Sequence, residues 1–308
     1  MKRNTEVLSP GRRRSLFAAL LVILFAFLTA LPSPDGNMGG GRAVPDRLFQ
    51  QAWISNPYWT HGEAELSRYT GTVIRYDQPR SADLVLVVVT EKMLRDQLVK
   101  ANDWNDRRGM LVFHFNQILS FTTGVYPYRQ MGSFFRAATD WRPIKMTLGS
   151  QEWCGNTFKE AITFGNKNLF RFHSYWQDEG DGEVQLKWKG DFDYYDNLPV
   201  LLRALAGAGP WKLDLVESQF SNTAAVPKLM AAEIRITGDQ ALTVEGKPAG
   251  SRIFEVKYQG KTDRYWVARD FPNLPLQWKR GDGVNFTLKK SRMLKYWELN
   301  NLGDENKF

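Results

Sequence analysis

The chain has 308 residues, 43% of them hydrophobic and 24% charged, a balance typical of a folded globular protein and not of a disordered one. Its single cysteine excludes a disulfide scaffold, a cysteine-based zinc finger and an iron–sulfur protein, because each needs several thiols. The three histidines have no partners at ligand spacing, so we predict no metal site. Phosphate-loop and dinucleotide-binding glycine motifs are absent from the sequence, and we predict no cofactor.

The net charge of +8 depends largely on the first 30 residues, which hold five basic residues and one acidic residue. Without them the net charge is +4, and the remaining basic residues are interspersed along the chain without blocks. Nucleic-acid binding needs a basic patch that follows the phosphates. We therefore expect no nucleic-acid partner.

The N-terminus has the two parts of an export signal. Arg12, Arg13 and Arg14 precede an apolar run from Leu16 to Leu31, which only Thr29 interrupts. We predict a signal peptide or N-terminal anchor over residues 1–31 and a protein of the periplasm or cell envelope. The run has 16 positions against the roughly 20 of a membrane span, which favours a removable signal. Membrane attachment through residues 16–31 is the alternative.

The remaining chain divides at segments rich in proline and glycine. Residues 32–45 contain three consecutive glycines and predict a flexible linker. An N-terminal β-rich part is expected over residues 46–206 and a C-terminal antiparallel part over residues 207–302, with the boundary at Gly207 to Pro210. Two separate domains and one shared sheet are both compatible with this pattern.

Alternation of apolar and polar residues predicts a mainly β fold, a curved antiparallel sheet or half-open barrel. A hairpin with an apolar face toward the core is predicted over residues 169–189, with its turn signal at Asp181-Gly182. One face of the first strand carries Phe170, Phe172, Ser174 and Trp176. One face of the second strand carries Val184, Leu186 and Trp188. Further strands are predicted at 71–76, 84–90, 111–121, 144–148, 158–164, 254–258, 264–268, 276–278 and 284–288.

Two short helices are predicted. Asp196 or Asn197 is a suitable N-cap for a helix over residues 198–206, Pro199 fits the first turn, and Gly207 ends the pattern. A short amphipathic helix is expected over residues 45–53.

Cys154 is the candidate nucleophile, because a histidine beside it would generate the reactive thiolate. His114 and His173 are the candidate bases. The competing expectation, which we favour, is that Cys154 is a small buried residue packed beneath Trp153, since unpaired cysteines are among the most buried residues.

Residues 121–128 contain hydroxyl groups, a glycine and two tyrosines that could contact a ligand. We take Thr123, Tyr126, Tyr128 and Trp153 as candidate ligand-binding residues. The competing interpretation, which we favour, is a strand end with a turn at Gly124 and Pro127.

Several short motifs make the chain similar to a family of uncharacterised exported bacterial proteins that often carry the label septum formation inhibitor Maf. These motifs are Tyr58-Trp59, Gly62 to Leu66, Val89 to Glu91, Phe115-Asn116, Thr123 to Tyr128 and Gln151 to Gly155. Maf pyrophosphatases themselves have a Ser-Pro-Arg-Arg turn after a strand, whereas Ser9-Pro10-Gly11-Arg12-Arg13 contains an additional glycine and follows no strand. The resemblance therefore implies export but no pyrophosphatase activity.

The C-terminal part resembles a β-rich exported domain of unknown function, through Tyr265-Trp266-Val267 and Asn273 to Lys279. That domain is similar in architecture to the half-open barrels of the lipoprotein carriers LolA and LolB. The resemblance implies a concave sheet face that holds an acyl chain or another apolar ligand.

These observations favour a non-enzymatic cell-envelope protein that binds a lipid-like or other apolar envelope ligand. An envelope enzyme that uses Cys154 and a membrane-anchored structural protein are the alternatives. The sequence alone identifies no protein partner.

Overall fold

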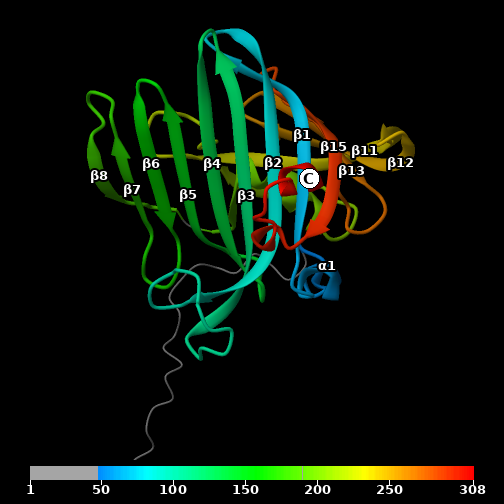
Figure 1. Ribbon diagram of the computed structural model, residues 1–308, viewed down its shortest axis with the longest axis horizontal. Coiled ribbons are helices and arrows are strands. Elements are labelled where there is room, and N and C mark those ends of the chain that lie inside the picture. Colours follow the sequence, from blue (N-terminus) through cyan, green and yellow to red (C-terminus); the bar gives the residue numbers. More distant parts are fainter. Residues whose placement is uncertain (1–47, 189) are drawn as a thin grey trace, which may run out of the picture. The chain divides into compact units, whose positions relative to one another are not determined.

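The computed structural model describes residues 48–188 and 190–308 (Figure 1). The predicted signal peptide, the predicted linker and the first residues of the predicted helix over 45–53 lie outside the described residues. No helix within the described ranges is long and apolar enough to cross a membrane.

Fifteen strands of the described chain form one curved sheet, as the mainly β prediction requires (Figure 1). They are β1 (Ala64–Arg75), β2 (Gln78–Leu94), β3 (Gly109–Thr123), β4 (Tyr126–Ala137), β5 (Pro143–Glu152), β6 (Gly155–Ile162), β7 (Leu169–Ser174), β8 (Asp181–Gln185), β9 (Phe192–Tyr194), β10 (Trp211–Val216), β11 (Leu229–Val244), β12 (Lys247–Tyr258), β13 (Lys261–Ala268), β14 (Pro275–Lys279) and β15 (Asn285–Leu294). The helices are α1 (Gln51–Ile54) and α2 (Leu198–Ala204), with 3-10 turns η1 (Pro57–Trp59), η2 (Tyr195–Asn197), η3 (Tyr296–Glu298) and η4 (Asp304–Lys307).

The first and last long strands are neighbours in the sheet. The strand order is β8-β7-β6-β5-β4-β3-β2-β1-β15-β14-β13-β12-β11-β10-β9, with antiparallel pairs throughout except β9 and β10. The β1–β15 pair joins residues on both sides of the Gly207 to Pro210 segment into one sheet. The hairpin turns after β1, β3 and β5 lie at one end, the top of Figure 1, which we call the hairpin end.

Alternation along the strands separates an inner face from an outer one. On β3, Phe113, Phe115, Leu119 and Phe121 point into the main core, whereas Val112 belongs to a smaller cluster on the outer face. Burying these aromatic rings on one side of a twisted sheet supplies the main apolar stabilisation of the fold.

The segment from β9 through η2 to α2 lies against the inner face. All seven residues of α2 are buried, and Arg203 in this helix donates two hydrogen bonds of 2.8 Å to Glu65 of β1. In β9, Asp193 accepts a 2.5 Å hydrogen bond from Arg136 of β4. These two buried ion pairs fix the segment to the N-terminal strands.

Some predicted elements differ in detail. Strands β4, β9, β10 and β11 have no counterpart among the predicted strands, and Pro127, expected in a turn, lies in β4. The predicted 169–189 hairpin is present, but Asp181 and Gly182, expected at its turn, begin β8 and pair with β7. Strand β8 ends at Gln185, and Val184 is exposed at this edge of the sheet. Helix α2 ends at Ala204, and the side chain of its N-cap residue Asn197 makes no capping hydrogen bond.

Candidate ligand-binding cavity on the inner face

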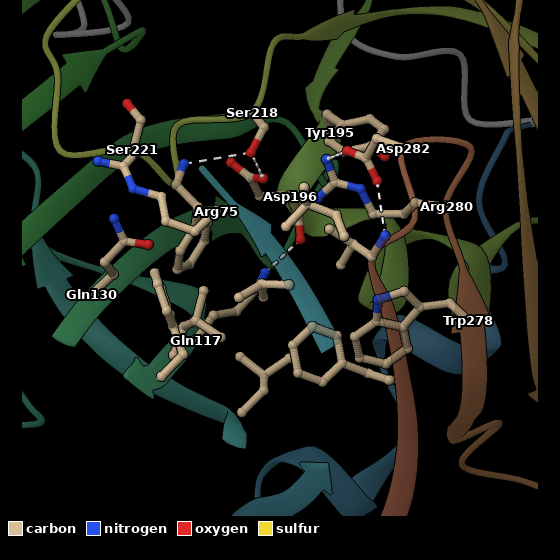
Figure 2. Close-up of a pocket in the computed structure, with 18 of the residues that line it drawn as sticks. Arg75, Gln117, Gln130, Tyr195, Asp196, Ser218, Ser221, Trp278, Arg280 and Asp282 are labelled. Carbon is tan, nitrogen blue, oxygen red and sulfur yellow. Dashed lines mark hydrogen bonds and ion pairs between the residues drawn. The ribbon is translucent and has the colours of Figure 1, made fainter. Parts of the chain in front are cut away.

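A cavity of about 380 Å³ lies between the inner faces of β1–β4 and of β13–β15 (Figure 2). Residues of η2, the start of α2 and the β10–β11 connection complete its wall. The lining residues are Val73, Ile74, Arg75, Leu84, Gln117, Leu119, Phe121, Tyr128, Gln130, Tyr195, Asp196, Pro199, Ser218, Phe220, Ser221, Asn222, Tyr265, Trp278, Arg280, Asp282, Val284 and Phe286. More than half of them are aliphatic or aromatic, so the cavity suits a ligand with a substantial apolar part.

The connection Glu217–Lys228 between β10 and β11, which we call the strap, borders the cavity. Lys159 on β6 is buried, and its ammonium group donates hydrogen bonds to the backbone oxygens of Gln219 at 2.5 Å, Ser221 at 3.4 Å and Thr223 at 3.0 Å. Burial lowers the pKa of Lys159 to about 8. A buried lysine therefore fixes the course of the strap.

Asn222 is the second anchor of the strap. Its backbone oxygen accepts hydrogen bonds from the Thr157 hydroxyl and from the Trp176 indole, both at 2.6 Å. Its side-chain oxygen accepts a 3.0 Å bond from Arg75, and its side-chain nitrogen donates to Glu152 at 3.3 Å. Four residues from different strands or turns therefore hold this one position.

Phe220 of the strap packs against Gly132 of β4, which has no side chain. A methyl group at Gly132 would lie 3.0 Å from the Phe220 ring and 2.9 Å from Phe134. Glycine on the inner face of β4 therefore makes room for the strap ring beside the cavity.

Arg280 and Arg75 stand on opposite sides of the cavity in Figure 2. The Arg280 guanidinium donates a 2.5 Å hydrogen bond to Asp282 and lies 4.8 Å from the centre of the Tyr195 ring. Burial lowers the pKa of Arg280, but Tyr195 and Asp282 outweigh this effect, and the net shift is upward. A carboxylate thus compensates the charge of this arginine.

Asp196 of η2 joins the strap to the sheet. Its carboxylate accepts hydrogen bonds from the Ser218 hydroxyl at 2.6 Å and the Gln219 amide at 2.7 Å, while its backbone oxygen accepts from Gln117 (Figure 2). Burial raises the pKa of Asp196, and the bonds from Ser218 and Gln219 oppose that rise. Because both carboxylate oxygens have partners, this acid is part of the cavity wall.

Arg75 ends β1 and has a different environment. Its guanidinium donates to the Tyr128 hydroxyl at 3.1 Å and to Asn222, and it lies 4.6 Å from the Tyr76 ring centre and 5.0 Å from that of Tyr128. The Tyr76 hydroxyl is hydrogen-bonded to those of Tyr126 and Tyr128, at 3.1 and 3.0 Å. An arginine and three tyrosines therefore form one polar cluster at the hairpin end.

Three of the four predicted ligand-binding residues lie in or beside this cluster. Tyr128 lines the cavity, Tyr126 belongs to the cluster, and Trp153 stacks on Tyr126 at 6.0 Å with 71% of its surface exposed. Thr123, by contrast, is buried and its hydroxyl has no hydrogen-bond partner within the described residues. Neither Trp153 nor Thr123 lines the cavity.

The expectation that Cys154 is buried is wrong. Residues 153 and 154 form the turn between β5 and β6, where Glu152 pairs with Gly155, and Cys154 is exposed at this turn. A hydrogen bond with Glu152 raises the pKa of the thiol, which disfavours the thiolate.

The structure does not bring either candidate base to this sulfur. Nδ1 of His114 lies 3.0 Å from Glu91, and that of His173 lies 3.1 Å from Asp181. In the described part of the chain, no hydrogen bond joins Cys154 to an imidazole, and no group of three or more His, Cys, Asp or Glu side chains is arranged to hold a metal ion.

The sequence analysis did not identify Arg75, Asn222 or Arg280. Arg75 and Asn222 are 147 residues apart and meet only because the sheet curves beneath the strap. The tyrosines were recognisable from their local motif, but the arginine that joins them was not.

Comparisons with known proteins give a fold likeness only. No protein-family model and no curated protein matches the chain. One similar solved structure is a crystal structure of a β-barrel-like protein of the domain of unknown function DUF1849 from Brucella abortus, with 11% identity and a TM-score of 0.44. The match covers 76% of this chain and 98% of that chain. This solved structure is itself a β-rich domain of unknown function. The resemblances to the Maf-labelled family and to LolA and LolB stay predictions.

Proposed function

We propose that this protein binds a small apolar or amphipathic molecule, a lipid-like compound of the cell envelope, in the inner-face cavity. The observation that carries the proposal is the cavity itself, whose volume of about 380 Å³ is typical of small-molecule sites. Its wall combines apolar side chains from both ends of the chain with a few polar groups. This combination favours an apolar ligand body that a small number of polar contacts orient.

The surroundings of the cavity support binding by a preformed site. Lys159 and Asn222 fix the strap, and the Asp196 carboxylate is fully hydrogen-bonded. Little side-chain ordering would then be needed when a ligand enters, which lowers the cost of binding. The exposed turn position of Cys154 and the raised pKa of its thiol favour this binding role over nucleophilic catalysis.

The first test is binding of a neutral fluorescent apolar dye, together with mass spectrometry of organic extracts from natively purified protein. Leu119→Trp would place a bulky indole ring in the cavity, whereas Met131→Trp changes an exposed residue on the outer face of β4. We expect the Leu119 variant to lose dye binding roughly tenfold or more and the Met131 variant to bind as the unchanged protein does. Equal binding by all three proteins would overturn the proposal.

We also propose that the chain is exported, on the basis of Arg12 to Arg14 and the apolar run from Leu16 to Leu31. Cell fractionation followed by mass spectrometry of the mature N-terminus tests this. A mature chain that begins after residue 31 would support a removable signal, and an intact Met1 in the membrane fraction would support an anchor. Recovery of the intact chain in the cytosol would contradict both.

A further inference from the structure

We propose that the ligand is an anionic amphiphile whose carboxylate or phosphate head binds the Arg75 guanidinium at the hairpin end, with its apolar tail in the cavity. This inference rests on the proposed binding function and adds the chemical class and orientation of the ligand. Arg75, Tyr76, Tyr128 and Asn222 form the head site.

The charge of Arg75 has no acidic partner in the part of the chain that the structure describes. Its hydrogen-bond partners, the Tyr128 hydroxyl and the Asn222 amide oxygen, are both neutral. Among residues 48–188 and 190–308, no carboxylate lies within 4.0 Å of this guanidinium, and its buried Nε has no hydrogen-bond partner. A partly desolvated cation with an unused donor is a favourable place for an anion, and the planar fork of arginine fits carboxylates and phosphates.

Other charged groups near this end have partners of their own. Glu152 is the acid connected most directly to the cluster, because it accepts a 3.3 Å hydrogen bond from Asn222 and a 2.6 Å bond from the Cys154 amide. Lys159 and Glu179 both bind strap backbone, at Gln219 and Ala224. Arg75 therefore remains the cation of this end that lines the cavity without a carboxylate partner among the described residues.

The apolar wall of the cavity lies next to Arg75. Val73 lies two residues before Arg75 on the same face of β1, and Phe121 stacks on Tyr128 at 4.8 Å. Leu119 follows on the inner face of β3. The apolar lining therefore begins directly beside the head site, and a single chain extending from Arg75 would contact it at once.

The solvent-facing side of the cluster fits an ionised head. Tyr76, whose ring lies against the guanidinium, is 58% exposed. A charged head near this surface keeps part of its hydration. The other arginine of the cavity wall, Arg280, is already neutralised by Asp282. Arg75 is therefore the more favourable of the two arginines for an anionic head.

The experiment compares three probes with the same chain: dodecanoate, dodecyl phosphate and the neutral dodecanol, each below its aggregation concentration. Displacement of the neutral dye gives their affinities for the unchanged protein, Arg75→Met, Arg75→Lys and the control Arg129→Met on the outer face. We expect at least one anionic probe to bind roughly tenfold or more tightly than dodecanol. Arg75→Met should remove this preference, so that the anionic probes and dodecanol bind with similar affinity, and Arg129→Met should retain it.

The probes distinguish a carboxylate head from a phosphate head, and they test the head site separately from the proposed binding function. Preference for dodecanoate or for dodecyl phosphate identifies the head, and inorganic phosphate or acetate should bind far more weakly because they lack the tail. Equal affinity for all three probes, unchanged in Arg75→Met, would overturn the head site and leave the binding function intact. Failure of the dye and of every probe to bind would overturn both. Arg75→Lys keeps the charge and supplies the comparison should Arg75→Met fail to fold.

Discussion

The arginines of the core and the arginine at the hairpin end of the cavity are stabilised by different groups. In the core, Arg203 forms two 2.8 Å hydrogen bonds with Glu65, and Arg136 forms a 2.5 Å bond with Asp193. At the hairpin end, Arg75 contacts only phenol and amide oxygens and two tyrosine rings. The core pairs hold the inner segment to the sheet, whereas Arg75 retains the capacity to bind an anion.

The difference has an energetic consequence. Removing one member of a buried ion pair leaves a charge without compensation in a low-dielectric interior, which is costly. Removal of Arg75 leaves no carboxylate unpaired, so it should alter ligand binding much more than folding. Substitutions in the two regions should therefore affect stability to different extents.

The largest expected effect is that of Arg203→Met. The buried Glu65 carboxylate would lose both hydrogen bonds from Arg203 and keep only the 3.0 Å bond from the Tyr58 hydroxyl. We expect the free energy of unfolding to fall by about 3–5 kcal/mol. Urea denaturation followed by tryptophan fluorescence measures this. The double variant Glu65→Leu with Arg203→Met removes both charges and should recover much of the loss; an equally unstable double variant would argue against the uncompensated charge as the cause.

A smaller loss is expected for Lys159→Met, which removes the lysine's hydrogen bonds to three strap backbone oxygens, two of which keep a bond from Ser221. The free energy of unfolding should fall by about 1–3 kcal/mol at pH 7. Dye binding should weaken as well, since Ser218 to Asn222 line the cavity. A variant as stable as the unchanged protein, with the same dye affinity, would show that Lys159 does not hold the strap.

The same lysine predicts a pH dependence. Its pKa in the folded protein is about 8, below the ordinary value of 10.5. Between these two values the unfolded chain binds a proton that the folded chain has released, so the Lys159 contribution to stability rises with pH across this window. The stability difference between the unchanged protein and Lys159→Met should therefore grow from pH 8 to pH 10.5. A constant difference would contradict a lowered pKa.

The smallest change in stability is expected for Arg75→Met, about 1 kcal/mol or less. Only hydrogen bonds to neutral partners and contacts with two rings are lost, and Tyr128 retains its bond to Tyr76. Urea denaturation beside Arg203→Met gives the comparison directly. A loss as large as that of Arg203→Met would show that Arg75 is part of the folding core.

The mainly β architecture could be predicted because strand alternation is a local property. Phe170 and Phe172 share the inner face of β7, and Phe113, Phe115 and Leu119 share that of β3. Strand β11 escaped prediction because most residues after Ile236 are exposed on both faces, and the register shifts between Ile236 and Gly238. Only the exposed second half depends on its partner β12 in this way, because Met230, Ala232 and Ile234 alternate into the core in the first half.

The site was only partly predictable, because its residues come from distant parts of the chain. Tyr126 and Tyr128 belong to one local motif, but Arg75 meets Asn222 through the closure of β1 onto β15 and the course of the strap. The apolar pattern of a single segment cannot predict a contact between residues so far apart in the sequence. The burial predicted for Cys154 failed for a local reason, since the turn between two predicted strands overrides the general tendency of cysteine to be buried.

Glu152 provides the last and mildest test, because it is an acid at the hairpin end that forms no ion pair within the described residues. Its hydrogen bond raises the pKa of the Cys154 thiol, so the reactive thiolate is scarcer than in an ordinary exposed cysteine. Glu152→Gln should accelerate alkylation of folded protein by iodoacetamide by a factor of roughly two to ten at pH 7.5, with no change after unfolding. The matched control is Glu183→Gln, which alters an exposed acid on β8. If Glu152 instead compensated the charge of Arg75 through Asn222, Glu152→Gln would also strengthen the binding of dodecanoate severalfold. Faster alkylation with unchanged dodecanoate binding would show that the carboxylate acts on the thiol alone. Arg75 would then have no acidic partner at this end of the sheet.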